Sequence, residues 1–431
     1  MIFYTGLNRR KEGNTIMRIQ QKRPLHLFEG YGVEMEYMIV DRDTLNIKPV
    51  CDKILQQLAG SIVNEWPTGM LALSNELVLH VIEIKTNGPA ESLFRMAENF
   101  QDEVRHVNNL LEALHAILMP GPMHPWMNPF TEMKLWPHEY NPIYEAYNRI
   151  FDCRGHGWAN LQSTHLNLPF CGDDEFEKLH AACRIILPLI PALSAASPIA
   201  DEISTPFLNY RMEVYRTNSK NIPSVTGKVI SEAVFSEAAY REQIFNRMYD
   251  DIAPYDPEGI LRDEWLNSRG VMARFDRGAI EIRIVDNQEC PAADMAILEW
   301  ITASIQALVE EKWCSLSEQK KWHENDLYEI FLDTIKNGER TRITNREYLN
   351  LFQVDKKSIE AGFLCQEIYE RVKGSFLFSP STAGSLGTIF NKGTLARRIL
   401  HSLPAAFTKK DLFQTYRKIC VCLNEGEFYV P

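Results

Sequence analysis

Cysteine pairs of the C-x-x-C type are absent from this sequence, whose nine cysteines are scattered over 431 residues. Zinc and iron–sulfur sites built on such pairs are therefore excluded, and Cys420 and Cys422 do not make a metal site by themselves. An odd number of scattered cysteines favours buried free thiols in a reducing compartment. We therefore expect a cytoplasmic protein.

Long apolar runs are also absent, and none approaches the length that spans a membrane. The first 23 residues are basic, but no apolar segment follows them, which argues against a secretory signal. We expect residues 1–27 to form a basic flexible extension, with Met17 as an alternative start of the chain. Neither feature predicts a membrane partner.

Positive charge is in the minority, because the sequence has 46 lysines and arginines but 57 aspartates and glutamates, which gives a net charge of −11. This balance argues against a general nucleic-acid binder and against a protein of anionic membranes. The phosphate-binding pattern G-x-x-x-x-G-K-[ST] is absent as well. A bound nucleotide would therefore be neutralised chiefly by metal ions and arginines.

What remains is an ordinary globular composition, with 45% hydrophobic and 24% charged residues. Alternating and β-branched segments predict strands at residues 31–41, 70–86, 158–170, 270–275 and 279–286. Apolar residues at helical spacing predict helices at residues 52–58, 90–118, 173–194, 231–249 and 292–313, and through most of the C-terminal region. Loops are expected at residues 119–149 and 197–225. This order predicts an α+β fold, with a curved, largely antiparallel sheet and helices packed on one face.

Glu34 and Glu36 lie in the first predicted strand, where successive side chains point to opposite faces. They share one face, about 7 Å apart, while Val33, Met35 and Tyr37 share an apolar face. Two shielded carboxylates repel each other, and a divalent cation with oxygen ligands is a usual compensation. The alternative is an edge strand that carries two solvated glutamates.

Glu83 interrupts an apolar run, so its side chain is expected to point inward or toward a site. Glu76 lies seven residues earlier, which on a straight strand means about 23 Å and the opposite face. The two carboxylates therefore share a site only if a turn or bulge lies between them. The alternative for Glu83 is a salt bridge to Lys85 or to a neighbouring arginine.

Two further strands carry polar pairs, His165 with Asn167 and Glu281 with Arg283, each pair on one face. A neutral imidazole can ligate a metal, and a carboxylate beside a guanidinium can place a metal ligand next to an anion clamp. The alternatives are a structural histidine and a same-face ion pair. One curved sheet could gather the four segments into a metal cluster, with enough ligands for two or three ions.

The order Glu-x-Glu, Glu-x6-Glu, His-x-Asn and Glu-x-Arg resembles that of the glutamate–cysteine ligases and related carboxylate–amine ligases, within the glutamine synthetase-like superfamily. The resemblance covers roughly residues 30–310 and includes the small-residue segment at residues 193–198. It implies a curved antiparallel sheet with Mg-ATP at one end. It also implies that ATP converts a carboxylate to an acyl phosphate, which an amine then attacks to give an amide.

By that resemblance, six side chains would be ligands for two or three Mg²⁺ ions, with Mn²⁺ as an alternative: Glu34, Glu36, Glu76, Glu83, His165 and Glu281. Arg283 would lie against the transferring phosphoryl group, and Asn167 beside the nucleotide. Arg211 is the candidate for the substrate carboxylate, and Arg216 is a weaker one. The His-x-Asn pattern departs from the His-x-His of many smaller members and is nearer the form of the larger glutamate–cysteine ligases, and the loop at residues 209–213 resembles the family's substrate loop only loosely.

The expected activity joins glutamate to an amine, with cysteine as the leading amine. We expect a catalytic domain at residues 28–313 and a mostly helical region at residues 314–431 packed on it. The expected partners are small molecules, namely ATP, a carboxylate and an amine. The sequence does not decide whether the chain forms an oligomer. The alternatives are a guanidino kinase of the same superfamily, a hydrolase, and a non-catalytic nucleotide- or metal-binding regulator, which the complete ligand set disfavours.

Overall fold

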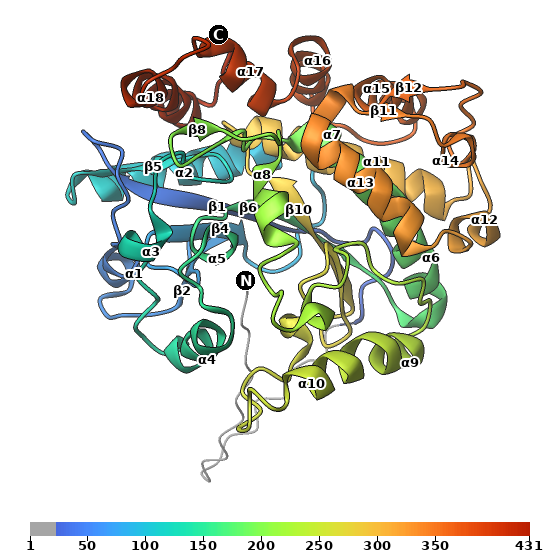
Figure 1. The fold of residues 1–431 in the computed structure, drawn as a ribbon, viewed down its shortest axis with the longest axis horizontal. Coiled ribbons are helices and arrows are strands. Elements are labelled where there is room, and N and C mark those ends of the chain that lie inside the picture. Colours follow the sequence, from blue (N-terminus) through green and yellow to red (C-terminus); the bar gives the residue numbers. More distant parts are fainter. Residues whose placement is uncertain (1–22) are drawn as a thin grey trace.

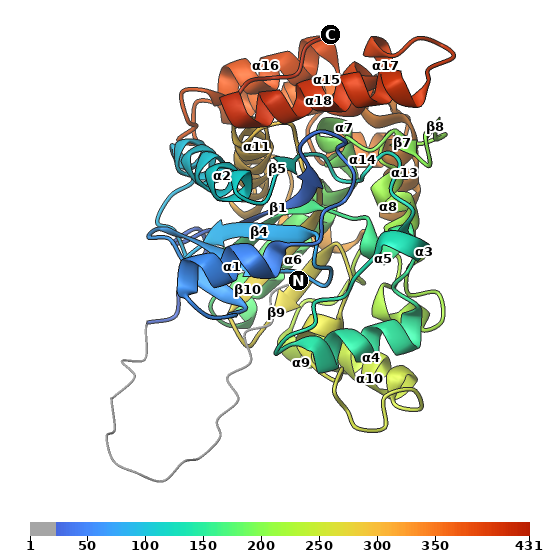
Figure 2. The ribbon, with the colours of Figure 1, turned by 90° about the vertical axis from the view of Figure 1, so that its left-hand side faces the viewer.

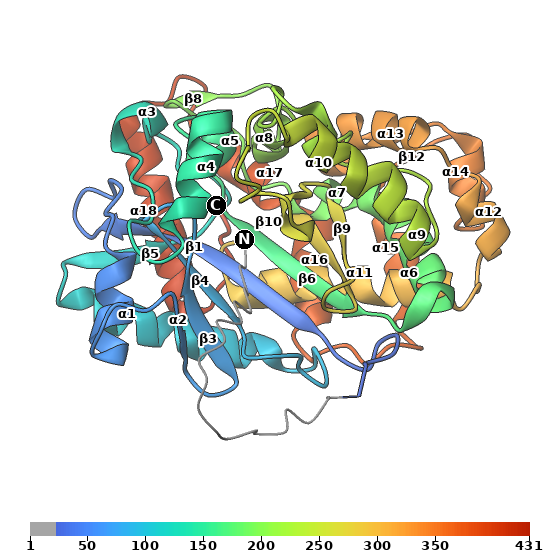
Figure 3. The ribbon, with the colours of Figure 1, turned by 90° about the horizontal axis from the view of Figure 1, so that it is seen from below.

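The computed structural model describes residues 23–431, and the extension expected at residues 1–27 lies almost entirely outside them. Eight strands form one antiparallel sheet: β1 (Gly32–Asp41), β2 (Glu65–Pro67), β3 (Leu71–Asn75), β4 (Val81–Thr86), β5 (Ala116–Met119), β6 (Ser163–Pro169), β9 (Val271–Arg274) and β10 (Ala279–Asp286). Their order is β2-β3-β4-β1-β6-β10-β9, and β5 also pairs with β1. Figure 3 shows β4, β1 and β6 side by side. The predicted antiparallel sheet is confirmed.

The helices that precede the C-terminal region are α1 (Cys51–Ala59), α2 (Met96–Glu112), α3 (Pro129–Glu132), α4 (Asn141–Phe151), α5 (His156–Ala159), α6 (Gly172–Ile186), α7 (Pro191–Ser194), α8 (Tyr210–Tyr215), α9 (Glu237–Tyr240), α10 (Arg247–Ile252) and α11 (Pro291–Val309). A π-helical stretch (Arg241–Asn246) joins α9 to α10. Helices α2 and α6 both pack on α11 and contact strands of the sheet, which is the helical layer that the sequence predicts.

The C-terminal helices are α12 (Leu316–Lys320), α13 (Glu324–Asn337), α14 (Arg346–Asn350), α15 (Ala361–Val372), α16 (Thr382–Lys392), α17 (Leu395–Ser402) and α18 (Lys409–Glu425). Helices α15–α18 gather at one end of the molecule (Figures 1 and 2). There α15 and α16 contact α11, while α18 contacts α2 and β5. Two short strand pairs complete the fold: β7 (Ile199–Ala200) with β8 (Ile203–Ser204), and β11 (Arg342–Ile343) with β12 (Ile359–Glu360).

β1 lies inside the sheet and not at its edge, because it pairs with β4 on one side and β6 on the other. Both of its faces are buried: Val33 and Met35 belong to the main core with residues of α2, α6 and α11. Glu34 and Glu36, on the opposite face, are only 4% and 6% exposed. The alternative of a solvated edge strand is therefore wrong, and the charge of these two carboxylates must be compensated inside the protein.

Helix α11 is long and apolar enough to cross a membrane, and it is the one such helix among residues 23–431. Most of it is buried within the molecule, because α2, α6, α15 and α16 pack around it. A buried core helix of a globular domain has the same composition.

Three connections differ from the sequence-based expectation. The helix expected at residues 90–118 ends at Glu112, and His115, with a φ of 52°, turns the chain back so that β5 can pair with β1. The loop expected at residues 119–149 contains α3 and most of α4, which begins with a proline near its N-terminus. The loop expected at residues 197–225 contains α8, whose N-cap Asn209 accepts a hydrogen bond from the Met212 backbone.

Candidate functional site

Strand register brings the predicted ligands into one patch on the face of the sheet opposite α11. Glu36 lies opposite Glu83 across the β1–β4 pair, and Glu34 lies opposite His165 across the β1–β6 pair. Glu281 lies opposite Asn167 across the β6–β10 pair. Directly opposed residues on antiparallel strands point to the same face, so alternation along each strand gathers these side chains. All of them are buried except Asn167, which is half-buried.

The imidazole of His165 stands between two groups of carboxylates. Its Nδ1 lies 2.9 Å from Glu34 Oε2 and 3.8 Å from Glu281 Oε1. Its Nε2 lies 3.9 Å from Glu36 Oε1. Two sets of potential ligand atoms, each within 4.8 Å of one another, follow from this arrangement: Glu34, His165 and Glu281, and Glu36, Glu83 and His165.

The predicted bend between Glu76 and Glu83 is present, because β3 and β4 form a hairpin whose connection contains Glu76. Burial raises the pKa of Glu76 well above its usual value, and the carboxylates of Glu36 and Glu83 add to that effect. A neighbouring positive charge would favour ionisation of Glu76.

Glu83 is fully buried and has two polar neighbours. Ser74 donates a hydrogen bond to its Oε1 at 2.7 Å, and Lys85 Nζ lies 3.4 Å from the same atom. The salt-bridge alternative is thus confirmed in geometry, although Lys85 lies closer to Glu65, at 2.6 Å. Burial alone would raise the pKa of Glu83, but Lys85 lowers it overall. Its Oε2 has no hydrogen-bond partner within the described part of the chain.

Glu281 and Arg283 form the same-face ion pair that the sequence allows, with 3.3 Å between Arg283 Nε and Glu281 Oε1. Both side chains are buried. Burial by itself would raise the pKa of Glu281, but the positive charge of Arg283, with His165 and Arg274, lowers it to about 2. Glu281 is therefore ionised at neutral pH, as a metal ligand must be.

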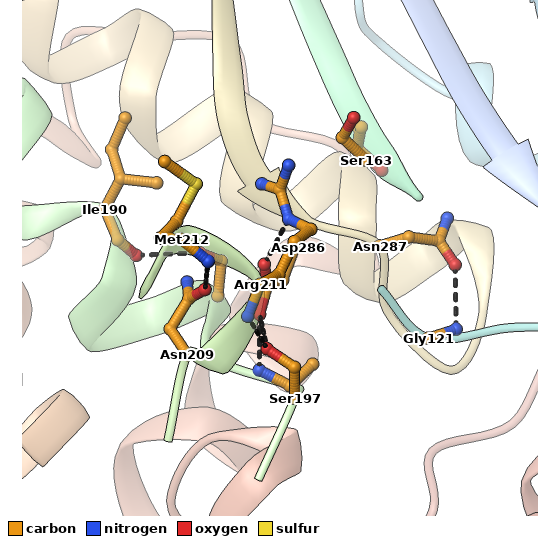
Figure 4. Close-up of polar contacts among 12 residues, drawn as sticks. Gly121, Ser163, Ile190, Ser197, Asn209, Arg211, Met212, Asp286 and Asn287 are labelled. Carbon is orange, nitrogen blue, oxygen red and sulfur yellow. Dashed lines mark hydrogen bonds and ion pairs between the residues drawn. The ribbon is translucent and has the colours of Figure 1, made fainter. Parts of the chain in front are cut away.

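Arg211 on α8 is buried and points toward the end of β10 (Figure 4). Its Nε donates to Asp286 Oδ1 at 2.6 Å, while its Nη2 has no hydrogen-bond partner among the described residues. Arg216, the weaker candidate, is instead held by Glu213 on the same helix through two hydrogen bonds of 2.7 Å. The structure thus separates the two arginines, because Arg211 keeps a buried donor available and Arg216 is paired near the surface.

One pocket joins the carboxylates to the two buried arginines. Five of the nine predicted site residues line it: Glu36, Glu76, His165, Arg211 and Arg283. Its remaining wall includes apolar and polar side chains from the β3–β4 connection, from α5 and from α8, such as Val78, Trp158 and Tyr215. Glu34, Asn167, Glu83 and Glu281 lie next to these residues in the sheet but do not line the pocket itself.

Three polar residues of the site were not predicted. Ser163 donates to Glu36 Oε2 through its backbone N–H at 2.7 Å, and its hydroxyl lies 2.8 Å from His165 Nε2. Ser74 binds Glu83, as described above. Tyr215 lines the pocket and donates to the Ser268 carbonyl. Ser163 lies two residues before His165 in the same strand, so its side chain points to the same face, and the sequence pattern could have predicted it as a site residue.

The donor set fits hard divalent cations. Carboxylate oxygens with one imidazole are suitable ligands for Mg²⁺ or Mn²⁺. The orphaned, fully buried Glu83 Oε2 is a negative oxygen that lacks a partner among residues 23–431. Asn167 supports the first ligand set, because its amide donates to Glu34 Oε1 at 2.9 Å and orients that carboxylate.

Comparison with known proteins gives matches over most of the chain. The sequence profile of glutamate–cysteine ligase family 2 matches residues 31–375. An uncharacterised protein of Archaeoglobus fulgidus is 31% identical over 399 residues, covering 93% of this chain and 100% of that protein. A Legionella pneumophila protein named "Putative glutamate–cysteine ligase 2" is 24% identical over 310 residues, covering 70% of each chain.

A likeness of fold covers the same share of the chain as the likeness of sequence. The solved structure of a glutamate–cysteine ligase from Francisella tularensis, in complex with AMP, superposes with a TM-score of 0.60. The superposition covers 93% of this chain and 90% of the other, at 12% identity. Together with the profile match, the order of the four polar strand segments identifies the family. The chain belongs to glutamate–cysteine ligase family 2.

Proposed function

We propose that the protein is an ATP- and Mg²⁺-dependent ligase that joins the carboxylate of glutamate to an amine, with cysteine as the leading amine. One observation carries the proposal: a single pocket is lined by buried carboxylates, by His165 and by two buried arginines, Arg211 and Arg283. Carboxylates hold the cations that accompany a nucleotide, and arginines bind phosphate or carboxylate groups. Membership of the family supports the ligase reaction.

The ligand geometry supports two cation positions. Glu34, His165 and Glu281 would hold one ion, and Glu36 and Glu83 would hold a second on the other side of the imidazole. Glu76 lines the pocket beside them and would complete the second position or serve a third ion. When bound, these Mg²⁺ or Mn²⁺ ions would neutralise phosphate charge and polarise the phosphoryl group.

The chemistry needs a leaving group on the carboxylate, because carboxylates are poor electrophiles. Transfer of the γ-phosphoryl group of ATP to the glutamate side chain would supply it, and attack by the amine would then release phosphate and leave an amide. Such a transfer depends on positioning and charge stabilisation more than on covalent help from the protein. Arg283 would face the phosphoryl oxygens, and Asn167 would lie toward the nucleotide.

Arg211 would bind the carboxylate substrate through its free Nη2. Asp286 holds the Nε of the planar guanidinium at 2.6 Å, so the available donor is held in one orientation before the substrate arrives. The solved relative from Francisella tularensis was determined with AMP, which supports use of an adenine nucleotide by this chain. The catalytic domain at residues 28–313, with the helices of residues 314–431 packed on it, and the cytoplasmic location stay predictions.

An assay of nucleotide turnover tests the proposal. The full chain is incubated with ATP, MgCl₂, glutamate and a panel of amines that includes cysteine, and ADP, phosphate and amide are measured together. We expect equal amounts of the three products with at least one amine. Absence of turnover with every amine would overturn the proposal.

The same assay, together with calorimetry of ATP binding, separates the alternative functions. A guanidino kinase would release ADP and give a phosphorylated product without free phosphate. A hydrolase would give product without nucleotide, and a regulator would bind ATP in calorimetry without consuming it. Each of these outcomes contradicts the ligase.

A further inference from the structure

A buried segment, residues 286–290, connects the candidate substrate arginine to the C-terminal helices. All five residues of the segment are 0% exposed, and it leads directly from β10 into α11. At its start, Asp286 pairs with Arg211. Three residues later, Glu289 pairs with Arg398 of α17. One short stretch of chain therefore carries both contacts.

The contact with the C-terminal region is a buried ion pair with further hydrogen bonds. Arg398 is 1% exposed and Glu289 is 0% exposed. Arg398 donates to the Glu289 carboxylate, to the carbonyl of Tyr429 at 2.6 Å and to the carbonyl of Gly393 at 3.2 Å. Arg398 thus connects three parts of the chain: the segment at residues 286–290, helix α17, and the C-terminal tail, residues 426–431.

A second connection runs from α17 to Arg211 by way of residues 195–197. The Ala396 backbone donates to Ala195 O at 2.9 Å. Next along the chain, the Ala196 N–H donates to Asp286 Oδ2 at 2.9 Å, and the Ser197 hydroxyl donates to the same oxygen at 3.1 Å. The Arg211 N–H then donates to Ser197 Oγ at 3.0 Å, as the arrangement in Figure 4 shows.

Apolar side chains also connect the C-terminal helices to the strand that carries Glu34 and Glu36. Met38 and Val40 continue the face of β1 that carries Glu34 and Glu36. They belong to a core cluster formed with residues of α17 and α18, among them Ile399. The C-terminal helices therefore cover the continuation of the strand face that carries the site.

We propose that Glu289 and Arg398 are positioning residues for Arg211, and that α17 with the C-terminal tail is in this way part of the substrate site. The proposal rests on the proposed function, in which Arg211 binds the substrate carboxylate. Neither Arg398 nor Tyr429 lies within the residues matched by the family profile, 31–375. The contact therefore involves residues beyond the stretch that the family profile matches.

The physical reason is the cost of separating buried charges. If α17 moved away, Arg398 would leave with it and Glu289 would stay buried without a partner of opposite charge, which is strongly unfavourable. The pair therefore holds residues 286–290 in one position. Asp286 in that position presents one fixed oxygen to Arg211 Nε, and the orientation of Nη2 follows because the guanidinium is planar.

Hydrogen–deuterium exchange tests this coupling without reference to activity. The variant is Glu289→Gln with Arg398→Met, which removes both charges and leaves neither unpaired. We expect the amides of Ala196 and Arg211 to exchange at least about tenfold faster, because both are bonded within the network. Unchanged exchange at these two amides would overturn the proposal.

The matched control is Arg397→Met, on the same helix, where Arg397 pairs with Glu339 at 2.8 Å outside the network. We expect this variant to leave the two amides unchanged, and an equal effect would mean general loosening of α17 and would also overturn the proposal. If the double variant does not fold, Glu289→Gln alone decides, because it removes one charge of the pair while keeping a hydrogen-bond acceptor for Arg398. A wild-type rate at both amides in that variant contradicts the coupling.

Kinetics then link the coupling to the site. We expect the double variant to raise the KM for glutamate at least about fivefold, with a smaller change in the KM for ATP. If the wild-type protein does not consume glutamate at all, the proposed function fails, while the exchange experiment still decides whether the pair positions Arg211. If exchange accelerates but both KM values stay unchanged, the positioning role is wrong.

Discussion

Burial is the property that turns ordinary polar residues of this chain into a candidate site. Glu83 is fully enclosed, yet it retains one oxygen without a hydrogen-bond partner in residues 23–431. An ionised carboxylate in that position is costly unless a cation completes it. Lys85 supplies part of the compensation, and a bound divalent ion would supply the rest.

Glu83→Gln tests this assignment. Glutamine keeps an acceptor for the Ser74 hydroxyl but removes the charge needed for a divalent ion, and Lys85 retains its contact with Glu65. We expect kcat to fall at least about a hundredfold, with a circular-dichroism spectrum like that of the wild type. Glu98→Gln, at an exposed glutamate on α2, is the control and should keep the wild-type rate. Full activity of Glu83→Gln would show that Glu83 is not a metal ligand.

Arg211→Lys tests the substrate contact. Lysine can keep the charge beside Asp286, but it cannot hold Asp286 with one nitrogen and offer a second, fixed nitrogen to the substrate. We expect the KM for glutamate to rise about tenfold or more, measured by initial rates at saturating ATP. Arg216→Lys, five residues along and paired with Glu213, is the matched control. An equal rise in both variants would contradict the specific role of Arg211.

At the scale of elements, antiparallel strand pairing brings the candidate ligands together. Each strand contributes one or two polar side chains at a spacing of two residues, and the register aligns those side chains across neighbouring strands. Where β1 meets β6, Gly32 lies directly opposite Asn167. A Cβ atom at position 32 would approach Asn167 Cβ to 2.9 Å, so glycine allows the close pairing there.

Gly32→Ala should therefore disturb both stability and site. The nearest atom is the Cβ of Asn167, which cannot move without its strand, so we expect a loss of about 1–3 kcal/mol in the free energy of unfolding. Urea unfolding measures it. Activity should also fall, because Asn167 orients Glu34. Gly384→Ala, in α16 with no heavy atom within 4 Å of the added Cβ, should not destabilise the protein. Equal stability of the two variants would contradict the argument.

At the scale of the whole molecule, the cluster makes cation binding a part of folding stability. Strands β1, β4, β6 and β10 and the β3–β4 connection each contribute a potential ligand, so the site exists only when the sheet is assembled. A ligand that binds the folded chain and not the unfolded chain stabilises it by mass action.

We expect the unfolding temperature to rise with MgCl₂ or MnCl₂, with a stabilisation of about 2.7 kcal/mol at a hundred times the Kd. Thermal unfolding followed by circular dichroism measures it, with NaCl at matched ionic strength as the control. Glu281→Gln should reduce the effect, because Glu281 belongs to one of the two ligand sets. A rise with MgCl₂ no larger than that with NaCl would argue against the cation sites.

Local periodicity determined a large part of this site from the sequence alone. The pairs Glu34 with Glu36 and Glu281 with Arg283 share faces because side chains alternate along any strand, whatever surrounds it. The spacing of Glu76 and Glu83 likewise showed that the two carboxylates could share a site only with a turn or bulge between them, and the structure has a hairpin there. These inferences need no knowledge of contacts between distant segments.

Tertiary structure decided what depends on contacts between segments far apart in sequence. Sequence alone did not show that β1 is central rather than at an edge, because that depends on pairing with β4 and β6. The resemblance ranked Arg211 above Arg216, but the pairing of Arg211 with Asp286, 75 residues away, exists only in the folded chain. Alternation along a strand is set by backbone geometry, whereas register, burial and ion pairing exist only once the whole sheet and its helices are packed.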